Sequence, residues 1–175
     1  KGGATRDDEG ILSLGGEHVN SFCEVQVRSA KYIPIEFHQS ILSTETKLND
    51  ILFVKDGATT GKVGMINKLE YTGQNINEHV FLLRPISTIN AFYLVNYLNS
   101  KVAQIMIKKL IAAATVTGIT KDAIKSLHIP IPSIDKQKEI ANHITGIRQQ
   151  AQQLKDKTKE LLKKASEEIE EILLN

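Results

Sequence analysis

Apolar residues are spaced in two different ways along this chain. From residue 1 to about residue 134, short apolar runs alternate with clusters of Gly, Thr, Asn and Asp, and all four prolines stand in this part. From residue 135 to residue 175, Ile, Leu and Ala recur at steps of three and four among Lys, Glu and Gln, without a proline. Short runs between turn residues predict strands, whereas apolar residues at steps of three and four predict a helix. The sequence therefore predicts two parts, residues 1–134 and residues 135–175.

The first part is predicted to be rich in β-structure. Its apolar runs lie close together, and most are separated by turn residues rather than by a helical pattern. Short connections favour antiparallel pairing, because parallel strands need a long crossover. The predicted strands are Gly10–Leu14, Glu24–Val27, Asp50–Lys55, Val63–Ile66 and Glu78–Arg84. We predict an α+β fold: a mixed, largely antiparallel, β-rich domain with a few helices, followed by a long C-terminal coiled-coil helix.

Helices are predicted in the later half of the first part. Thr88 or Asn90 can cap the first of them, because a short polar side chain accepts a hydrogen bond from the opening turn. Its apolar stripe is predicted to break into two helices at residues 99–100. Thr120 is placed to cap a short helix that ends at Ser126. The Pro-containing segment after it is predicted to be extended.

The second part is predicted to form one long helix with a coiled-coil seam. Ser133 is placed to cap it, and Asp135 puts a negative charge in the first turn, where the helix dipole favours it. The apolar steps alternate between four and three, which is a heptad repeat with one stutter near its end. The predicted seam consists of Ile140, Ile144, Ile147, Ala151, Leu154, Thr158, Leu161, Ala165, Ile169 and Ile172. About forty helical residues span roughly 60 Å, so this seam needs a partner helix from another copy or from another part of the protein.

Composition narrows the classes of protein to which the chain could belong. One cysteine, Cys23, cannot form an intramolecular disulfide or a multi-thiolate metal site. Apolar runs fall short of the roughly 18 residues that a membrane span needs, and no signal peptide opens the chain. We therefore expect a cytoplasmic protein that does not associate with membranes. The opening KGGATRDDEG, without a methionine, reads as the middle of a domain, so we expect a trimmed chain. The net charge of +2 is too small to argue for nucleic acid by itself.

The stretch VKDGATTGKVG, residues 54–64, invites comparison with a phosphate-binding P-loop. A P-loop reads G-x-x-x-x-G-K-[ST] and opens a helix. Here only three residues separate Gly57 from Gly61, and Val63 stands where the magnesium-binding hydroxyl belongs. The residues that follow are β-branched and glycine-containing rather than helical. The sequence therefore predicts a loop between two strands, whose Thr and Lys side chains can face a nucleic-acid backbone or base edges.

Patterns typical of catalysis are missing from the sequence. The five histidines have neither an i,i+4 pair nor companion carboxylates or thiolates at metal-ligand spacing. Glu45-Thr46-Lys47 resembles half of a nuclease motif, but a suitable Pro-Asp does not precede it. The sequence lacks a G-x-S-x-G motif, and it lacks the glycine fingerprint and long parallel sheet of a Rossmann fold. We expect neither enzymatic activity nor a bound metal or cofactor.

The order of these segments resembles a known family over essentially the whole chain. GILSLGGEHV is followed by LNDILFVKDGATTGKVGMI, NEHVFLLRP, a helix with YLVNYLNS, the TVTGIT loop and KDAIKSLHIPIPSIDKQKEI. This order is similar to the specificity (S) subunit of type I restriction–modification systems. The chain looks like one target recognition domain followed by one conserved spacer helix. Lys136 stands where the family commonly has Glu, at a position that reads as a helix start.

The resemblance implies a function and a set of partners. In that family the recognition domain reads one half of a bipartite sequence in double-stranded DNA. The spacer helix pairs antiparallel with a second one, from the same chain or from another half-subunit, and thereby sets the distance between two recognition domains. The assembly docks modification subunits, which bind S-adenosylmethionine and methylate adenine, and a restriction subunit that uses ATP. The chain is thus expected to be a non-catalytic specificity component, with those cofactors only on its partner subunits.

Donor side chains on loops are the candidate contacts to DNA, because phosphates and base edges accept hydrogen bonds from them. The candidates are Arg28, Lys31, Lys55, Thr59, Thr60, Lys62, Thr115, Thr117 and Lys121. Two alternatives stay open: a recognition module from a fused restriction–methyltransferase, or a coiled-coil assembly scaffold that does not bind nucleic acid.

Overall fold

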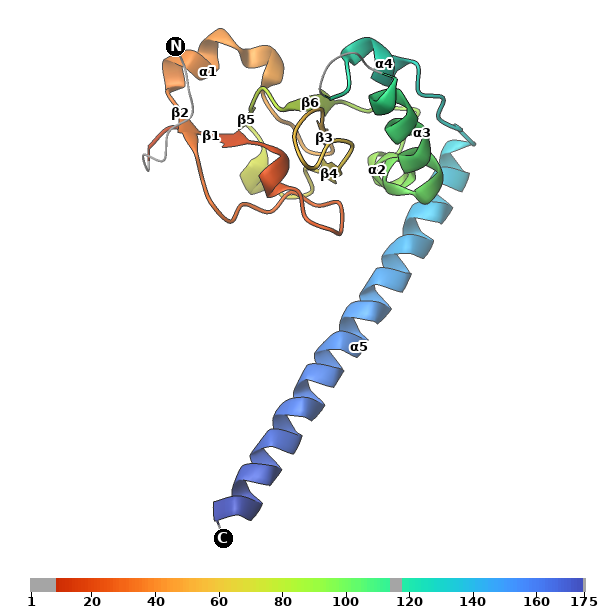
Figure 1. The fold of residues 1–175 in the computed structure, drawn as a ribbon. Helices are drawn as coiled ribbons and strands as arrows, with labels where there is room; N and C mark the ends of the chain where they lie inside the picture. The colour runs from red at the N-terminus through yellow and green to blue at the C-terminus, as the bar shows by residue number, and fades with distance from the viewer. Residues whose placement is uncertain (1–8, 114–117, 175) are drawn as a thin grey trace. The chain divides into compact units, whose positions relative to one another are not determined.

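The structure of the chain is a computed structural model, which describes residues 9–113 and 118–174 (Figure 1). The chain divides into two compact units, residues 1–137 and residues 138–175. The first contains all the strands and the shorter helices of the described residues, and the second consists of the long terminal helix beyond its first turn.

The central sheet of the first unit has the strand order β4-β3-β6. It is formed by β3 (Ile51–Val54), β4 (Val63–Met65) and β6 (Val80–Leu83), and both pairs are antiparallel. Phe53 lies opposite Val63 on one side and Phe81 on the other. The three strands predicted in these regions, and their antiparallel pairing, are confirmed.

The second sheet has the order β2-β1-β5 and shorter strands. β1 (Ile11–Leu14) was predicted and pairs antiparallel with β2 (Tyr32–Ile33), but it pairs parallel with β5 (Asn75–Ile76). Each of the latter two has only two residues, too few for a periodic signal. The two sheets together give the mixed, largely antiparallel arrangement that the sequence predicts.

The prediction of a strand at Glu24–Val27 is wrong. The segment makes only two isolated bridges, Val19 to Val25 and Glu24 to Met65. Cys23 adopts a φ of 62°, outside the extended region, and its side chain is buried. This left-handed residue turns the chain just before the predicted strand, so a continuous ladder does not form.

Short helices connect the strands of the two sheets. α1 (Ile35–Ser40) follows Pro34, whose fixed φ of −58° suits the residue before a first turn. Three short 3-10 helices occupy Gly16–His18, Leu42–Thr44 and Leu69–Tyr71. None of these was predicted, because one or two helical turns carry too few apolar positions for a period.

The helices in the later half of the first unit begin after residues whose side chains cap them. Asn90 caps α2 (Ala91–Asn99), and its side chain accepts a hydrogen bond from the backbone of Tyr93. Ser100 caps α3 (Lys101–Ala112), so the predicted break between the two helices is confirmed. α4 (Lys121–Lys125) starts after Thr120, whose hydroxyl accepts a hydrogen bond from Ala123. Each cap satisfies a backbone N–H that the helix leaves unpaired.

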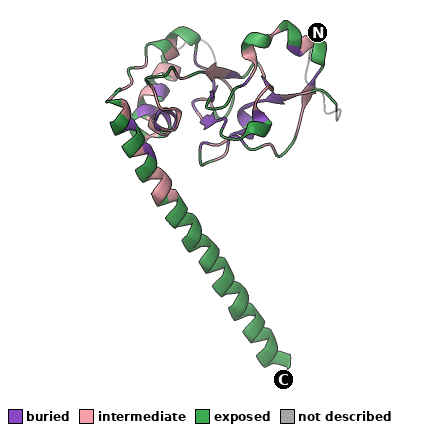
Figure 2. Ribbon diagram, turned by 180° about the vertical axis from the view of Figure 1, so that it is seen from behind, coloured by how far each residue is buried: buried purple, intermediate pink, exposed green. Residues whose placement is uncertain are grey.

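The core of the first unit lies on both faces of β3, whose four residues are all buried (Figure 2). Ile51 and Phe53 pack on one face with residues of α2 and α3 such as Leu98 and Ile107. Leu52 packs on the other face, in a cluster with Leu14. Alternate residues of a strand point to opposite faces, so one central strand supports two cores.

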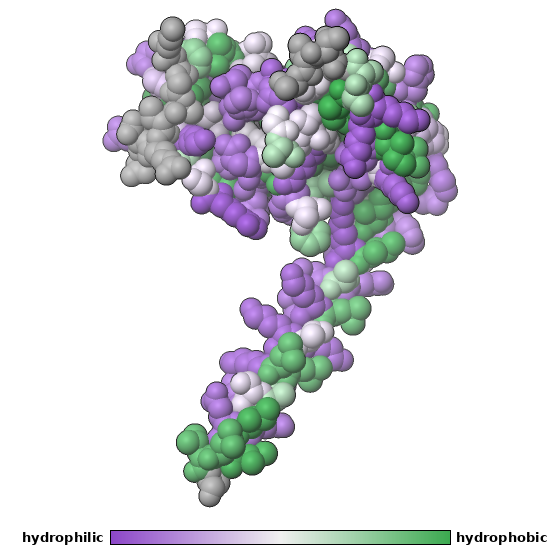
Figure 3. Space-filling model, viewed as in Figure 1, coloured by the Kyte–Doolittle hydropathy of each residue, from purple (hydrophilic) through white to green (hydrophobic). Residues whose placement is uncertain are grey.

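The terminal helix α5 (Ile134–Leu174) has 41 residues, as the sequence predicts for this segment. The Ser133 hydroxyl accepts a hydrogen bond from the backbone of Lys136 at 3.4 Å. All described residues from 151 onward are exposed, and apolar side chains follow one another down the helix among hydrophilic ones (Figure 3). Leu154 is 67% exposed and Leu161 is 57% exposed, so the described residues leave these seam positions uncovered.

Candidate nucleic-acid interface

The loop of residues 55–62 joins β3 to β4 and is held in one conformation by its own hydrogen bonds. The Gly61 N–H donates to the carbonyl of Val54 at 2.8 Å, and the Thr60 hydroxyl donates to the carbonyl of Gly57 at 2.7 Å. Gly57 and Gly61 have φ values of 85° and 90°, which favour glycine. A strand follows this loop and not a helix, so the loop lacks the helix N-terminus that a P-loop uses to bind phosphate. The predicted strand-to-strand loop is confirmed.

Helix α3 supports the base of this loop. The side-chain amide of Gln104 donates to the carbonyl of Gly61 at 2.9 Å and to the carbonyl of Leu98 at 2.8 Å. A Cβ added at Gly61 would lie 3.0 Å from the side chain of Ile107, so the chain passes close to the helix there. Residues 57–59 of the loop are exposed, and Thr60 is half-buried.

A second segment, distant in sequence, lies against the start of the same loop. The Ile119 N–H donates to the carbonyl of Lys55 at 2.7 Å. Gly118 has a φ of 109°, and a Cβ added there would lie 2.5 Å from the same carbonyl oxygen. Lys121 follows as the exposed first residue of α4. The structure thus brings Lys55 and the segment before Lys121 together, while Thr115 and Thr117 lie outside the described residues.

Lys55 stands beside a hydrogen-bonded pair, Asp56 and His79, which the sequence did not assign to the interface. Its ammonium lies 4.0 Å from a carboxylate oxygen of Asp56 and 5.6 Å from the ring centre of Phe81. The other carboxylate oxygen of Asp56 lies 2.6 Å from Nδ1 of His79. Asp and Glu accept hydrogen bonds from cytosine amino groups in the major groove. The Asp56-Gly57 turn was the available signal in the sequence, but it indicated only a turn.

Lys62 and Arg28 line a cavity of about 360 Å³. The Lys62 ammonium donates a hydrogen bond to the backbone carbonyl of Val19, so part of its donor capacity is used inside the domain. Arg28 is exposed, and it forms no ion pair within the described part of the chain. Glu17 lines this cavity and lies 3.7 Å from the ammonium of Lys31.

Six of the seven described candidates fall into three groups rather than one continuous patch, and the seventh, Lys121, lies on α4. Lys31 and Lys55 line one cavity, Arg28 and Lys62 line another, and Thr59 and Thr60 stand at the tip of the loop between β3 and β4.

Metal-binding groups of three or more His, Cys, Asp or Glu residues are not found among residues 9–113 and 118–174. In the same ranges, none of the helices has the length and apolarity to cross a membrane.

Comparison with known proteins assigns the family. The family model for the type I restriction modification DNA specificity domain matches residues 29–170. This range includes the loop between β3 and β4, the helices that support it, and most of α5. The chain belongs to this family. The resemblance derived from the sequence is thereby confirmed, and the chain is a DNA specificity domain of the type I restriction–modification class.

Solved structures with the fold of this specificity domain agree with that assignment. A chain from a study of complex assembly and conformational transition of the type I R-M system matches with a TM-score of 0.62, at 20% identity, over 86% of this chain. The HsdS subunit from Thermoanaerobacter tengcongensis also matches with a TM-score of 0.62, at 12% identity, over 87% of this chain. The specificity domain spans 34% and 40% of those two chains. A search of curated proteins gives no match.

Proposed function

We propose that this specificity domain reads one half of a bipartite site in double-stranded DNA and positions modification subunits there. The family match to a DNA specificity domain over residues 29–170 carries this proposal. The loop between β3 and β4, with Thr59 and Thr60 exposed or half-exposed at its tip, suits contact with DNA. Specificity and catalysis are then divided: this chain supplies recognition, and S-adenosylmethionine and ATP bind only to partner subunits.

Helix α5 suits the role of a spacer between two such recognition domains. Its 41 residues span about 60 Å at 1.5 Å per residue. A coiled-coil seam of exposed apolar residues favours an antiparallel partner helix, from a second copy or from a second half-subunit. The distance between two half-sites in DNA would then follow from the helix length, as half-site spacing does in dimeric DNA-binding proteins.

The direct test is co-expression of this chain with the modification subunit of its own system, followed by genome-wide mapping of methylated adenines. We expect methylation at one bipartite motif with a fixed spacer. Replacing Thr59 and Thr60 by Ala should weaken or relax methylation at one half of the motif, whereas replacing exposed Lys47, which lies outside the three groups, should not. Methylation without any sequence preference would contradict the proposal.

The partner arrangement is tested separately by solution mass. We expect self-association through α5, which Leu154→Asp and Leu161→Asp should abolish because they place charge on the seam. Exposed Gln149→Asp, outside the seam, is the matched control. A strict monomer at high concentration would count against self-paired spacer helices. Association that persists without any binding of DNA would favour the coiled-coil scaffold, and catalytic domains encoded upstream of the chain would favour the fused enzyme.

A further inference from the structure

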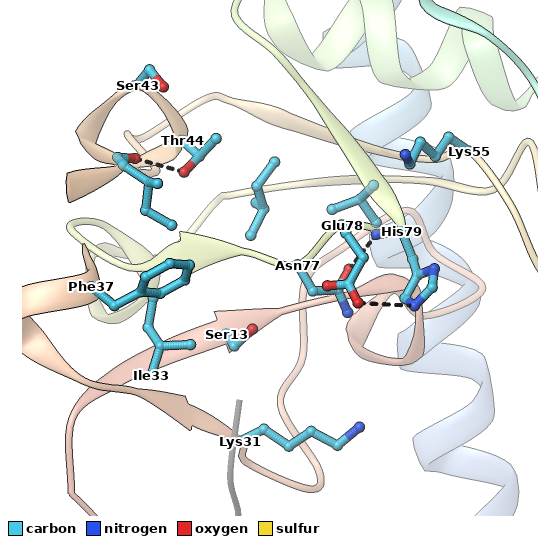
Figure 4. Close-up of a pocket in the computed structure, with 13 residues that line it drawn as sticks. Ser13, Lys31, Ile33, Phe37, Ser43, Thr44, Lys55, Asn77, Glu78 and His79 are labelled. Carbon is cyan, nitrogen blue, oxygen red and sulfur yellow. Dashed lines mark hydrogen bonds and ion pairs between the residues drawn. The ribbon is translucent and has the colours of Figure 1, made fainter. Parts of the chain in front are cut away.

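The larger cavity of the first unit has a volume of about 850 Å³ and lies between the second sheet, α1 and the start of β6. One wall is apolar, and it comes from β2, α1, β5 and β6. Its residues are Ile33, Phe37, Ile41, Ile76 and Val80. Figure 4 shows the ring of Phe37 and the side chain of Ile33 next to each other at one end of this cavity. A flat apolar group could therefore be covered on this side.

The hydroxyl of an otherwise buried residue, Ser13, faces the cavity. Ser13 is only 4% exposed, yet it lines the cavity (Figure 4). Its backbone N–H donates to the carbonyl of Lys31 at 2.8 Å, but its hydroxyl has no hydrogen bond to any described residue. A neighbouring hydroxyl, that of Thr44, is fully engaged with the carbonyl of Ile41 and with Asn75. Buried side-chain nitrogen and oxygen atoms without a partner are not found in the described part of the chain, so this hydroxyl is open to the cavity, where a ligand can replace water as its partner.

Two lysines stand at the margin of the cavity, and both have weak ionic partners. Lys31 lies 3.7 Å from a carboxylate oxygen of Glu17, and the two side chains are 43% and 45% exposed. Lys55 lies 4.0 Å from Asp56. Exposed ion pairs of this kind contribute little, so either lysine can exchange its carboxylate for another anion at small cost. The cavity thus combines an apolar wall, a hydroxyl open to a ligand and two lysine ammonium groups. Glu78, whose side chain is 81% exposed, also lines it.

We propose that this cavity binds a single nucleotide. The base would pack on the apolar wall beside Phe37, with an edge on the Ser13 hydroxyl and the phosphate near Lys31 and Lys55. A base offers a flat apolar body with polar edges joined to a phosphate, which is the chemistry that the three features select together. The volume lies within the range of small-ligand sites, roughly 300–1,000 Å³.

The nucleotide could come from either of two sources. Lys55 belongs both to the cavity and to the loop between β3 and β4, so a base turned out of DNA bound at that loop would have the cavity beside it. Extruding a base costs a few kcal/mol, which contacts in a fitted pocket can offset. This source rests on the proposed function, whereas binding of a free nucleotide does not.

The first experiment titrates free deoxynucleoside monophosphates into the full chain and follows binding by calorimetry and amide NMR shifts. Ser13→Leu removes the hydroxyl and narrows the cavity beside it, and Lys31→Gln removes one cation. Ser13→Leu removes the hydroxyl and places a larger side chain where the base would lie, so it should weaken binding by at least about fivefold. Lys47→Gln, outside the cavity, should leave binding unchanged. Deoxyribose 5-phosphate, which lacks a base, should bind much more weakly than a nucleotide.

The second experiment uses duplex DNA that carries the methylated motif, with 2-aminopurine placed at one position after another. A fluorescence change at one position, lost in Ser13→Leu while the duplex is still retained, supports the DNA source. Binding of free nucleotides alone supports the free source. If neither responds to Ser13→Leu or Lys31→Gln, the proposal is overturned. Circular dichroism and thermal unfolding check that Ser13→Leu folds. If that variant does not fold, nucleotide binding by Lys31→Gln decides whether the cavity is the site. Failure to bind any duplex rejects the proposed function, but the titration of free nucleotides still decides whether the cavity binds a nucleotide.

Discussion

The side-chain carbonyl of Gln137 accepts a hydrogen bond at 2.8 Å from the backbone N–H of Asn90, the residue that caps α2. The amide nitrogen of the same side chain donates to the carbonyls of Thr88 at 3.1 Å and Pro132 at 2.9 Å. Gln137 is completely buried. One side chain in the first turn of α5 therefore joins the loop before α2 to the segment before α5, and both segments depend on it.

Replacing Gln137 by Leu should strongly destabilise the first unit. The change keeps a similar volume but leaves three backbone groups without their partner, and a buried unsatisfied polar group costs about 1–3 kcal/mol. We expect the free energy of unfolding in urea to fall by at least about 3 kcal/mol. Gln149→Leu, at an exposed position of α5, is the matched control and should change it by less than about 0.5 kcal/mol. Equal effects of the two changes would mean that these hydrogen bonds contribute little.

Replacing Arg84 by Met should destabilise the fold because it leaves a buried carboxylate without its cation. Asp50 is 1% exposed, and it accepts hydrogen bonds from Nε of Arg84 at 2.8 Å and from Nη2 at 2.7 Å. The Asp50 hydrogen bond also raises the pKa of Arg84 above its ordinary value. The loss should be about 2–3 kcal/mol, because Arg84 itself is partly exposed and one end of the pair is screened.

A second substitution separates the ion pair from its surroundings. Asp50→Asn in the Arg84→Met background should restore part of the lost stability, because it removes the uncompensated charge. Arg28→Met, at an exposed arginine, is the control for loss of a guanidinium. Additive effects of the Asp50 and Arg84 changes in urea unfolding would show that the two side chains do not interact energetically.

Alkaline unfolding should depend on Tyr93. Burial, with a smaller contribution from Tyr97, raises the pKa of Tyr93, and its hydroxyl donates to the carbonyl of Pro130 at 2.8 Å. Below the pKa of the unfolded chain, about 10, tyrosine is neutral in both states and adds no pH dependence. Above it the unfolded chain loses the proton first, so the free energy of unfolding falls as pH rises.

The measurement compares wild type with Tyr93→Phe in urea between pH 7 and pH 11. At pH 7 the variant should be less stable by about 1 kcal/mol, because it lacks the hydrogen bond to Pro130. Above about pH 10 its stability should fall less steeply than that of wild type, since it has no phenol to ionise there. Parallel curves over the whole range would show that Tyr93 does not contribute to alkaline unfolding.

Glycines at three positions provide a graded test of how the loops dock. Gly118→Ala should be the most harmful, because the new Cβ would lie 2.5 Å from the Lys55 carbonyl in a left-handed backbone. Gly57 has a φ of 85° but open space around it, so Gly57→Ala should cost only about 1 kcal/mol of conformational strain. Gly146→Ala, inside α5 with nothing within 4 Å, should stabilise the helix by up to about 1 kcal/mol. Thermal unfolding checks this order, and equal effects at residues 118 and 57 would contradict close docking at Lys55.

The sequence was informative where one local signal decides the structure. Capping residues such as Asn90 and Thr120 predicted helix starts, and the apolar run of β3 predicted a strand. It was uninformative where long-range contacts decide. The parallel pairing of β1 with the two-residue β5 joins residues some sixty positions apart. A strand predicted from the apolar residues of Glu24–Val27 fails because the left-handed turn at Cys23 precedes it.

The candidate interface shows the same limit. Loop donors such as Lys55 and Thr59 could be proposed from residue type alone, because phosphates and base edges need donors. Their grouping could not be predicted, because it depends on long-range backbone hydrogen bonds. The Lys55 N–H donates to the carbonyl of His79, and the Lys55 carbonyl accepts from the N–H of Ile119. Asp56 directly follows Lys55, so that partner is visible in the sequence, whereas Glu17 lies near Lys31 through a contact that the spacing of the two residues does not reveal.

The two lysines of the loop between β3 and β4 should differ in how they affect DNA binding. Each phosphate contact contributes about 0.9 to the slope of log affinity against log salt. Lys55→Gln should lower that slope by about this amount, because the carboxylate that Lys55 meets among the described residues, that of Asp56, lies 4.0 Å away. Lys62→Gln should lower the slope less, since its ammonium is bonded to the Val19 carbonyl, but it should reduce the free energy of unfolding more. Filter binding of the methylated motif at several salt concentrations, with urea unfolding of the same variants, measures both quantities. If Lys62→Gln instead gives the larger change in salt slope and leaves stability unchanged, the ammonium of Lys62 leaves Val19 to contact DNA. In that case the small cavity lined by Arg28 and Lys62 belongs to the phosphate-binding surface.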